Sequence, residues 1–358
     1  MGTRMQARLA YFGVGVLAGV GAGAGYWRVY KQLELSDSLE SRHKNTELPL
    51  EQRVFKYGRP ESPFSSRTYT SHSVLYDHVH KVPLWSAEVI TPQGISGPAK
   101  RGNSRFQPDP TILTRFSSGN ADYLKSGWSR GHMTPAADCK HCQSAMDDSH
   151  YLTNIVPQDF NNNSGYWNRL EMFCRDLAEK YPAVYVTSGP LYLPSPSLDD
   201  GGKKFVKYQV IGAGKVAVPT HLYKVILAET DDSSDPASQP PPSLGVFVVP
   251  NKPLGDEELT SFQTTLTELE TLCGISFHSK LDRSNVSDLC KTDKCKLMTT
   301  LELKQFVYSL RLGRAKSEEQ IGEILDEAKK EGLERDSVIA QSAAQQGNKL
   351  NTSATNGS

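Results

Sequence analysis

Residues 128–142 read WSRGHMTPAADCKHC, and two kinds of chemistry compete for this stretch. Cys139 and Cys142 have the C-x-x-C spacing that forms half of many zinc sites. A structural zinc ion needs four ligands, however, and the next paired cysteines, Cys290 and Cys295, lie far downstream and are spaced C-x4-C. Because this ligand set is incomplete, we interpret the six cysteines mostly as reduced thiols. A zinc site split between the two pairs is the alternative.

A catalytic interpretation uses the arginine and histidine of the same stretch together with residues 163–171, which read NSGYWNRLE. Asn163 and Glu171 are eight positions apart, a little over two helical turns, so both are expected on roughly one side of a helix. Their amide and carboxylate oxygens suit Mg²⁺, which keeps most of its water ligands. His132 could take a proton from an attacking water, and Arg130 could stabilise charge on a phosphate. Together these residues predict phosphodiester hydrolysis at a single metal ion.

Hydrophobic periodicity places these motifs on regular elements. Two strand-like stretches, 69–79 and 83–91, are separated by a short turn and predict a hairpin. A further strand is expected at 151–158, and a helix at 163–181. The apolar residues of that helix recur at helical spacing: Trp167, Leu170, Cys174 and Leu177.

Four separated motifs carry a resemblance to a known family: SRGH (129–132), NNNSGYWNRLE (161–171), VTSGP (186–190) and VPTHLYKVI (218–226). From about Phe55 to about Arg283, the chain resembles the DNA/RNA non-specific endonuclease family of ββα-metal fold. This resemblance implies an α+β fold, in which a ββα-metal finger accompanies a central mixed or antiparallel sheet. Most members read Asp-Arg-Gly-His where this chain has Ser129. With its terminal additions, the chain resembles the mitochondrial exo/endonuclease-G-like branch rather than endonuclease G itself.

The resemblance implies a role for each residue of the central motif. His132 would be the general base, and Asn163 would be the one direct protein ligand of Mg²⁺, with Mn²⁺ as a substitute. Asn161 and Asn162 compete for the ligand role, but only Asn163 keeps the eight-residue step to Glu171. Glu171 would hold metal-bound water.

Two arginines and one serine complete the implied site. Arg130 would contact the scissile phosphate, and Arg101 would be a second phosphate clamp. The aspartate of the family helps to fix the active-site loop, so the neutral Ser129 is expected to hold the loop differently. Neither the base nor the metal ligand is lost by this change, and activity is still expected.

Each of these side chains also has a simpler interpretation. Asn163 could cap the helix, a role that is compatible with metal binding. Glu171 could be a solvated helix residue, and Arg101 could be a surface charge. Trp167 is interpreted as a core residue rather than as a platform for base stacking.

The N-terminus contains an uncharged stretch of 19 residues, Leu9–Trp27. That length suffices for a helix to cross a hydrocarbon core about 30 Å thick. Arg4 and Arg8 precede it, and the first acidic residue is Glu34. These features predict a single-pass anchor in the mitochondrial inner membrane, whereas another membrane anchor and a cleaved signal are the alternatives.

The chain is predicted to have five parts: an anchor (1–32), a stalk (33–54), a nuclease domain (55–288), a C-terminal helical appendage (289–340) and a disordered tail (341–358). Within the appendage, helices are expected at 301–310 and 317–331. The tail is assigned to disorder because its residues are mostly Gln, Asn, Ser, Thr and Gly. Basic and acidic residues balance at 40 each. Nucleic acid must therefore be bound by a local patch rather than by a global positive field.

The leading functional hypothesis is a Mg²⁺-dependent, sugar-non-specific nuclease. The branch that the chain resembles implies a 5′-to-3′ exonuclease that favours single-stranded DNA, acts in mitochondrial DNA processing or repair, and forms a homodimer. RNA and RNA–DNA hybrids are further candidate substrates. The alternatives are a general endonuclease of the endonuclease G type and a catalytically inactive nucleic-acid-binding membrane protein. The intact set of His132, Asn163 and Glu171 argues against the inactive protein.

Overall fold

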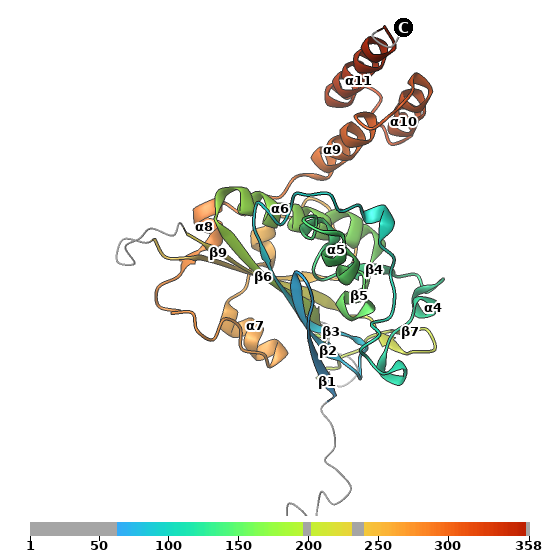
Figure 1. Cartoon of the computed structure of the whole chain (residues 1–358). Helices are drawn as coiled ribbons and strands as arrows, with labels where there is room; N and C mark the ends of the chain where they lie inside the picture. Colours follow the sequence, from blue (N-terminus) through green and yellow to red (C-terminus); the bar gives the residue numbers. More distant parts are fainter. Residues whose placement is uncertain (1–62, 196–201, 231–239, 356–358) are drawn as a thin grey trace, which may run out of the picture. The chain divides into compact units, whose positions relative to one another are not determined.

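The computed structural model describes residues 63–195, 202–230 and 240–355 (Figure 1). Its centre is a seven-stranded sheet with the order β1-β2-β3-β6-β9-β10-β11. Neighbouring strands are antiparallel except for the last pair, β10 and β11, so the expected mixed sheet is confirmed. The strands are β1 (Phe64–Thr68), β2 (His72–Asp77), β3 (Val82–Ile90), β6 (Ala183–Leu191), β9 (His221–Glu229), β10 (Ser243–Pro250) and β11 (Ser287–Asp288).

Strands β2 and β3 of this sheet form the predicted hairpin. Its turn contains Lys81, whose φ of 57° lies in the left-handed region. On β2, every second residue from His72 to Tyr76 is buried, as expected for a strand with one face against the core. His72 of β2 lies opposite Glu88 of β3, which is also buried.

A small second sheet and the helix that follows it form the ββα unit. Strand β4 (Ser129–His132) pairs antiparallel with β5 (Ile155–Gln158). A π-helical turn, η5 (Asn162–Tyr166), then leads into α6 (Trp167–Lys180). The strand at 151–158 and the helix at 163–181 are thus confirmed in substance, whereas β4 was not predicted. With four residues and a glycine in the middle, β4 is too short to show an alternating pattern.

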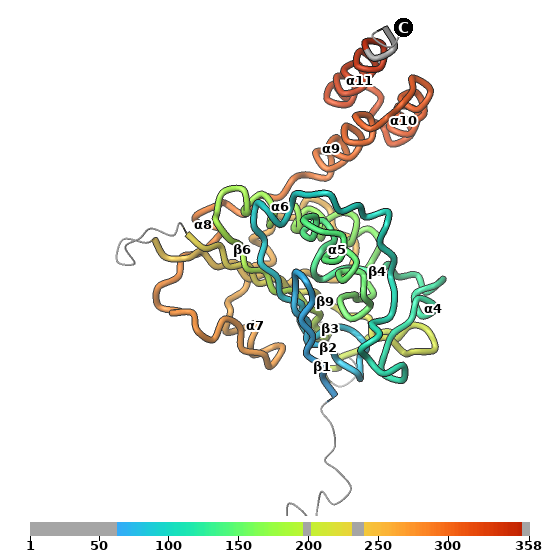
Figure 2. The backbone as a smooth tube through the Cα atoms, viewed as in Figure 1, coloured from blue at the N-terminus to red at the C-terminus, as the bar shows by residue number. Residues whose placement is uncertain are grey.

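Helices cover both faces of the large sheet (Figures 1 and 2). The predicted apolar stripe of α6 is buried, and it shares one core cluster with Leu222 and Ile226 of β9. Because successive residues of a strand point to opposite faces, Tyr223 of β9 belongs to a second apolar cluster, separate from that of α6. There it packs with Leu266 and Leu269 of α7 (Leu266–Cys273), which Gly274 ends in a left-handed conformation.

Shorter elements connect these parts. They include the helices α4 (Asn120–Tyr123), α5 (Gln143–Ser149) and α8 (Leu289–Asp293), the strands β7 (Val210–Ile211) and β8 (Val216–Ala217), and the 3-10 turns η1 (Arg101–Asn103) and η4 (Leu152–Asn154).

After α8 (Leu289–Asp293), the described residues of the C-terminal region form three helices, of which two were predicted. Helices α9 (Thr300–Leu312) and α10 (Glu318–Lys330) confirm the expected elements. The predicted disordered tail at 341–358 is wrong over most of its length, because α11 spans Ser337–Thr355. Ile339 and Ala343 of α11 are buried in one cluster with apolar residues of α9 and α10. This packing stabilises α11, whose mostly polar residues would not form a stable helix in isolation.

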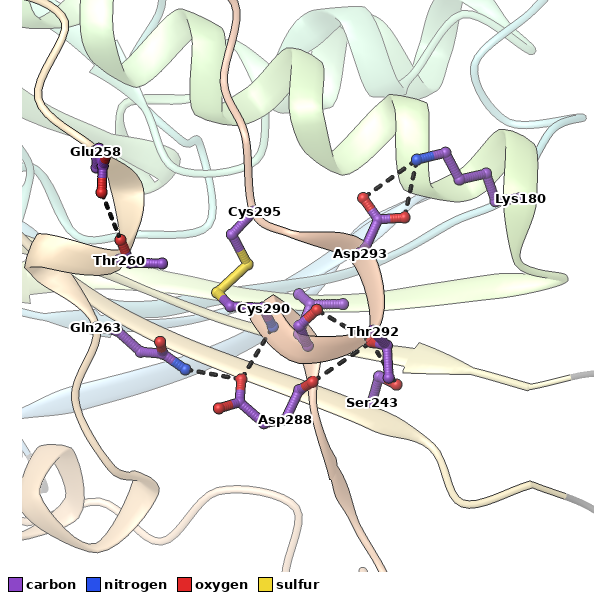
Figure 3. The surroundings of a disulfide bond; sticks show 11 residues. Lys180, Ser243, Glu258, Thr260, Gln263, Asp288, Cys290, Thr292, Asp293 and Cys295 are labelled. Carbon is purple, nitrogen blue, oxygen red and sulfur yellow. Dashed lines mark hydrogen bonds and ion pairs between the residues drawn. A yellow bond between two sulfur atoms is a disulfide. The ribbon is translucent and has the colours of Figure 1, made fainter.

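One cysteine assignment needs correction. Cys290 and Cys295 form a disulfide at α8, beside the ion pair of Lys180 with Asp293 (Figure 3). The disulfide uses the second cysteine pair and so excludes the split zinc site. Among the residues that the structure describes, no cluster of three or more His, Cys, Asp or Glu side chains is arranged to hold a metal ion. The remaining cysteines are free thiols, as expected: Cys139, Cys142, Cys174 and Cys273.

The predicted fold class also included an N-terminal transmembrane helix, and this part is corrected. Across the described ranges, no helix is both long and apolar enough to cross a membrane. The stretch Leu9–Trp27, on which the prediction depended, lies outside those ranges. Within the described ranges, the architecture is therefore an α+β fold with C-terminal helices and no membrane-spanning helix.

Candidate active site

The pairing of β4 with β5 sets the frame of the candidate site. Ser129 lies opposite Gln158, and His132 lies opposite Ile155. Gly131 is required by this pairing, because a Cβ atom there would lie 2.0 Å from Oε1 of Gln158. The first residue of β4 is thereby placed next to the turn that carries Asn163.

Ser129 connects the strand to the predicted metal ligand. Its Oγ donates a hydrogen bond to the carbonyl oxygen of Gln158 at 2.7 Å. The hydroxyl has only one proton, so it must accept the bond that joins it to Asn163 Nδ2 at 3.0 Å. This arrangement fixes the carboxamide of Asn163 with its NH₂ group toward Ser129 and leaves Oδ1 for another partner. Ser129 thus holds Asn163 through a neutral hydroxyl, at the position where the resemblance implies an aspartate.

The two preceding asparagines, Asn161 and Asn162, are placed differently from Asn163. Asn162 is fully buried, and its Nδ2 donates to the carbonyl oxygens of Pro250 and Lys252 at 3.2 and 3.0 Å. Its Oδ1 accepts from Nε2 of Gln158 at 2.8 Å, so the whole amide is engaged in structure. Asn161 is exposed. Asn163 does not cap the helix, because the residue before η5 is Asn161 and no side chain caps that turn.

The π-turn η5 changes the angle between Asn163 and Glu171. In an uninterrupted α-helix, eight residues advance about 800°, which leaves the two side chains about 80° apart. The wider ring of a π-turn rotates the chain through a smaller angle per residue. The turn therefore brings the two side chains closer to one face than the sequence spacing alone indicates.

Glu171 is half-buried, and the charged side chains around it include the buried Lys224 and Asp138. Burial raises its pKa to about 7, against the opposing effect of Lys224 and Arg175. Asp138, which pairs with Arg175 at 2.7 Å, raises it further. The interpretation of Glu171 as a solvated helix residue is therefore wrong. A cation near this carboxylate would favour its ionised form.

His132 has the environment of a neutral imidazole. Only 7% of the residue is exposed, and burial is the main cause that holds its pKa well below the ordinary value. Its Nε2 is buried without a hydrogen-bond partner within the described part of the chain. An unprotonated imidazole is the form that a general base requires.

The two arginines differ in how they are held. Arg130 is half-buried, with its guanidinium 5.3 Å from the ring centroid of Phe106 and 5.5 Å from that of Tyr123. These cation–π contacts orient the group. Among the described residues, one long contact of 3.4 Å, to the carbonyl oxygen of Asn120, uses a guanidinium donor.

Arg101 is exposed on η1. With Lys100, Lys140 and Arg175, it lines a cavity of about 1070 Å³. Its charge lowers the pKa of both His132 and Glu171. This electrostatic effect, with the neighbouring cations of the cavity, favours the phosphate-clamp role over an isolated surface charge.

The structure thus links the predicted residues in two ways. Ser129 joins Asn163 directly to the strand of Arg130 and His132, and the charge of Arg101 acts on His132 and on Glu171. Trp167 is fully buried and belongs to the core, as expected. Phe106 and His150, which pack against His132, were missed because neither belongs to a spaced motif.

The arrangement fits a hard divalent cation. Asn163 presents a carboxamide oxygen, and Glu171, about two helical turns further along, can supply a carboxylate that holds a hydration shell. Such a donor set leaves most coordination positions to water, as Mg²⁺ prefers.

Comparisons with known proteins identify the family of this chain. A family model for DNA/RNA non-specific endonucleases matches residues 51–284. The chain is 42% identical to the mitochondrial nuclease EXOG of Danio rerio, over 91% of this chain and 92% of the relative. It is 46% identical to that of Homo sapiens, over 78% of this chain and 75% of the relative.

Endonuclease G is more distant in these comparisons. The mitochondrial endonuclease G of Bos taurus is 37% identical, over 62% of this chain and 71% of the relative. A chain in the crystal structure of the EndoG/EndoGI complex matches with a TM-score of 0.58 and 35% identity, covering 67% of this chain and 96% of that one. The EXOG relatives are named as mitochondrial nucleases, and the present chain is likewise a hydrolytic nuclease. It belongs to the DNA/RNA non-specific endonuclease family.

Proposed function

We propose that this chain hydrolyses phosphodiester bonds in a Mg²⁺-dependent reaction, with Asn163 as the direct ligand and His132 as the general base. The observation that carries the proposal is the contact between Ser129 and Asn163, because it presents the carboxamide oxygen while a neutral imidazole lies on the same strand. Mn²⁺ is expected to replace Mg²⁺, since it accepts the same oxygen ligands.

Each side chain has a defined task in this reaction. His132 takes a proton from the attacking water, and Glu171 orients water of the hydration shell. Arg130 binds the scissile phosphate, and Arg101 binds a phosphate at the edge of the cavity. When bound, Mg²⁺ stabilises the negative charge that develops on the phosphate oxygens.

These side chains address the phosphate backbone, which predicts weak dependence on base and sugar. DNA is therefore the expected substrate, and RNA and RNA–DNA hybrids are expected to be cut as well. The chain is expected to act in mitochondrial DNA processing or repair, because its relatives are named as mitochondrial nucleases.

We further propose that this chain is a 5′-to-3′ exonuclease, that it prefers single-stranded DNA, and that it forms a homodimer. The similarity to EXOG nucleases supports this mode, since it reaches 91% of the chain and so includes C-terminal helices. The match to endonuclease G covers only 62% of the chain and supports the alternative, a general endonuclease.

Digestion of three substrates separates the two modes. An exonuclease of the proposed polarity releases the label early from 5′-labelled DNA, releases it late from 3′-labelled DNA, and leaves a closed circle intact. Nicking of the circle at a comparable rate would support the endonuclease instead. A chelator should abolish all cleavage, and added Mg²⁺ or Mn²⁺ should restore it.

A further inference from the structure

The ring of His150 packs against the proposed general base, and the proposed reaction does not use it. The ring centroids of His132 and His150 are 4.8 Å apart, with the planes at 84°, an edge-to-face contact. Phe106 contacts both rings, at 5.1 Å from His132 and 5.0 Å from His150. Both histidines are buried, with only 2% of His150 exposed.

Hydrogen bonds at the end of α5 fix His150 in place. Its Nδ1 lies 2.8 Å from the carbonyl oxygen of Met146. A carbonyl can only accept, so Nδ1 carries the proton, and Nε2 of the neutral ring keeps its lone pair. The hydroxyl of Ser149 lies 3.3 Å from the same Nδ1. The ring of His150 is thereby held against His132.

Most of the positive groups around His132 and His150 lower the pKa values of the two rings. After burial, the charge of His150 is the next cause that lowers the pKa of His132, followed by Arg101 and His72. The pKa of His150 is itself lowered, first by burial and also by Arg101, whereas Asp147 and the Met146 carbonyl raise it. At this ring separation, two positive imidazoles would repel each other, so a proton on one ring disfavours a proton on the other.

We propose that His150 is a positioning residue for His132, which holds the ring of the base in place and competes with it for a single proton. His132 then stays unprotonated at a lower pH than it would beside a ring that cannot be charged. This inference rests on the proposed function, because it assigns His150 to the base of that reaction.

The substitution H150F separates the two parts of this role, because it keeps an aromatic ring but removes the ionisable nitrogens. At pH 8 to 9, the kcat of H150F on linear DNA is expected within about threefold of wild type. The acidic limb of its pH–rate profile is expected to move toward neutral pH by about half a unit or more. The substitution H150A also removes the packing, and its kcat is expected to fall about tenfold further. The matched control H141F changes an exposed histidine and should leave the profile unchanged.

A profile of H150F that superimposes on wild type would overturn the proposal and leave His150 as a packing residue. Ring-proton NMR titration of the wild-type chain tests the same coupling without any substitution. Coupled rings give two-step curves that share midpoints, whereas independent single-step curves for His132 and His150 would also overturn the proposal. The variant H132A keeps the two tests apart: if it still cuts DNA, the proposed base is wrong whatever H150F shows.

Discussion

At the residue scale, the site depends on how one hydroxyl distributes its hydrogen bonds. Ser129 donates to the carbonyl of Gln158 and accepts from Asn163, and this order determines which end of the carboxamide is free. The sequence could indicate Asn163 as a ligand through its spacing to Glu171. It could not indicate the orientation of the amide, because that depends on a partner 34 residues earlier in the chain.

Removal of the Ser129 hydroxyl should loosen Asn163. In S129A, the carboxamide loses its hydrogen-bond acceptor, and the expected loss of kcat is about 10- to 100-fold, with a higher Mg²⁺ concentration at half-maximal rate. S129T keeps the hydroxyl and serves as the control. Equal Mg²⁺ dependence of S129A and wild type would show that the serine does not orient the ligand.

The raised pKa of Glu171 predicts a specific dependence of stability on pH. Because its pKa is about 7 in the folded chain and the ordinary value is 4.5, the carboxylic acid is favoured by folding. Its contribution to stability is therefore present at low pH and is lost as the pH rises through about 7. Without divalent cation, E171Q should be more stable than wild type by about 1–3 kcal/mol at pH 8, and about equal at pH 5.

Urea unfolding at the two pH values measures this difference. E179Q, an exposed position on the same helix, is the control and should change little at either pH. A stability gain in E171Q that is the same at pH 5 and pH 8 would contradict the assignment.

At the scale of elements, α6 could be predicted and the elements around it less well. Trp167 to Leu177 give a regular stripe over three turns, and all of it is buried. Strand β4 has too few residues for a pattern, and the π-turn η5 has no signal in composition. Helix α11 was missed because its stability comes from burial of Ile339 and Ala343 against other helices rather than from its own residues.

The disulfide at α8 gives a prediction at this scale. Cys290 and Cys295 are separated by five positions, and closing so short a loop contributes about 2 kcal/mol in the chain-entropy account. The double variant C290S/C295S should lose about this much stability and become insensitive to reductant in thermal unfolding. C142S, which removes a free thiol, should keep the sensitivity of wild type. Reductant without effect on wild type would argue against a stabilising bond.

At the scale of the whole molecule, the chain combines balanced charge with a local basic region. Lysines and arginines equal aspartates and glutamates at 40 each, yet Lys100, Arg101, Lys140 and Arg175 line one cavity, where they outnumber the acidic Asp176 and Glu179. Family membership could be predicted because four motifs keep their order along the chain, and a ββα unit was expected only through that resemblance. The surroundings of His132 could not be predicted, because Phe106 and His150 lie outside the motifs and contact His132 only in the folded chain.

The rate of DNA hydrolysis by N163A over a series of Mg²⁺ concentrations is the most direct test of the proposed site, with N161A as the matched control. Asn161 is an exposed asparagine two positions away and should be dispensable. Loss of the direct ligand predicts a rate at least about a hundredfold lower for N163A at every Mg²⁺ concentration, with N161A close to wild type. If N163A cuts DNA as fast as N161A across the series, Asn163 is not the ligand and the proposed reaction is wrong.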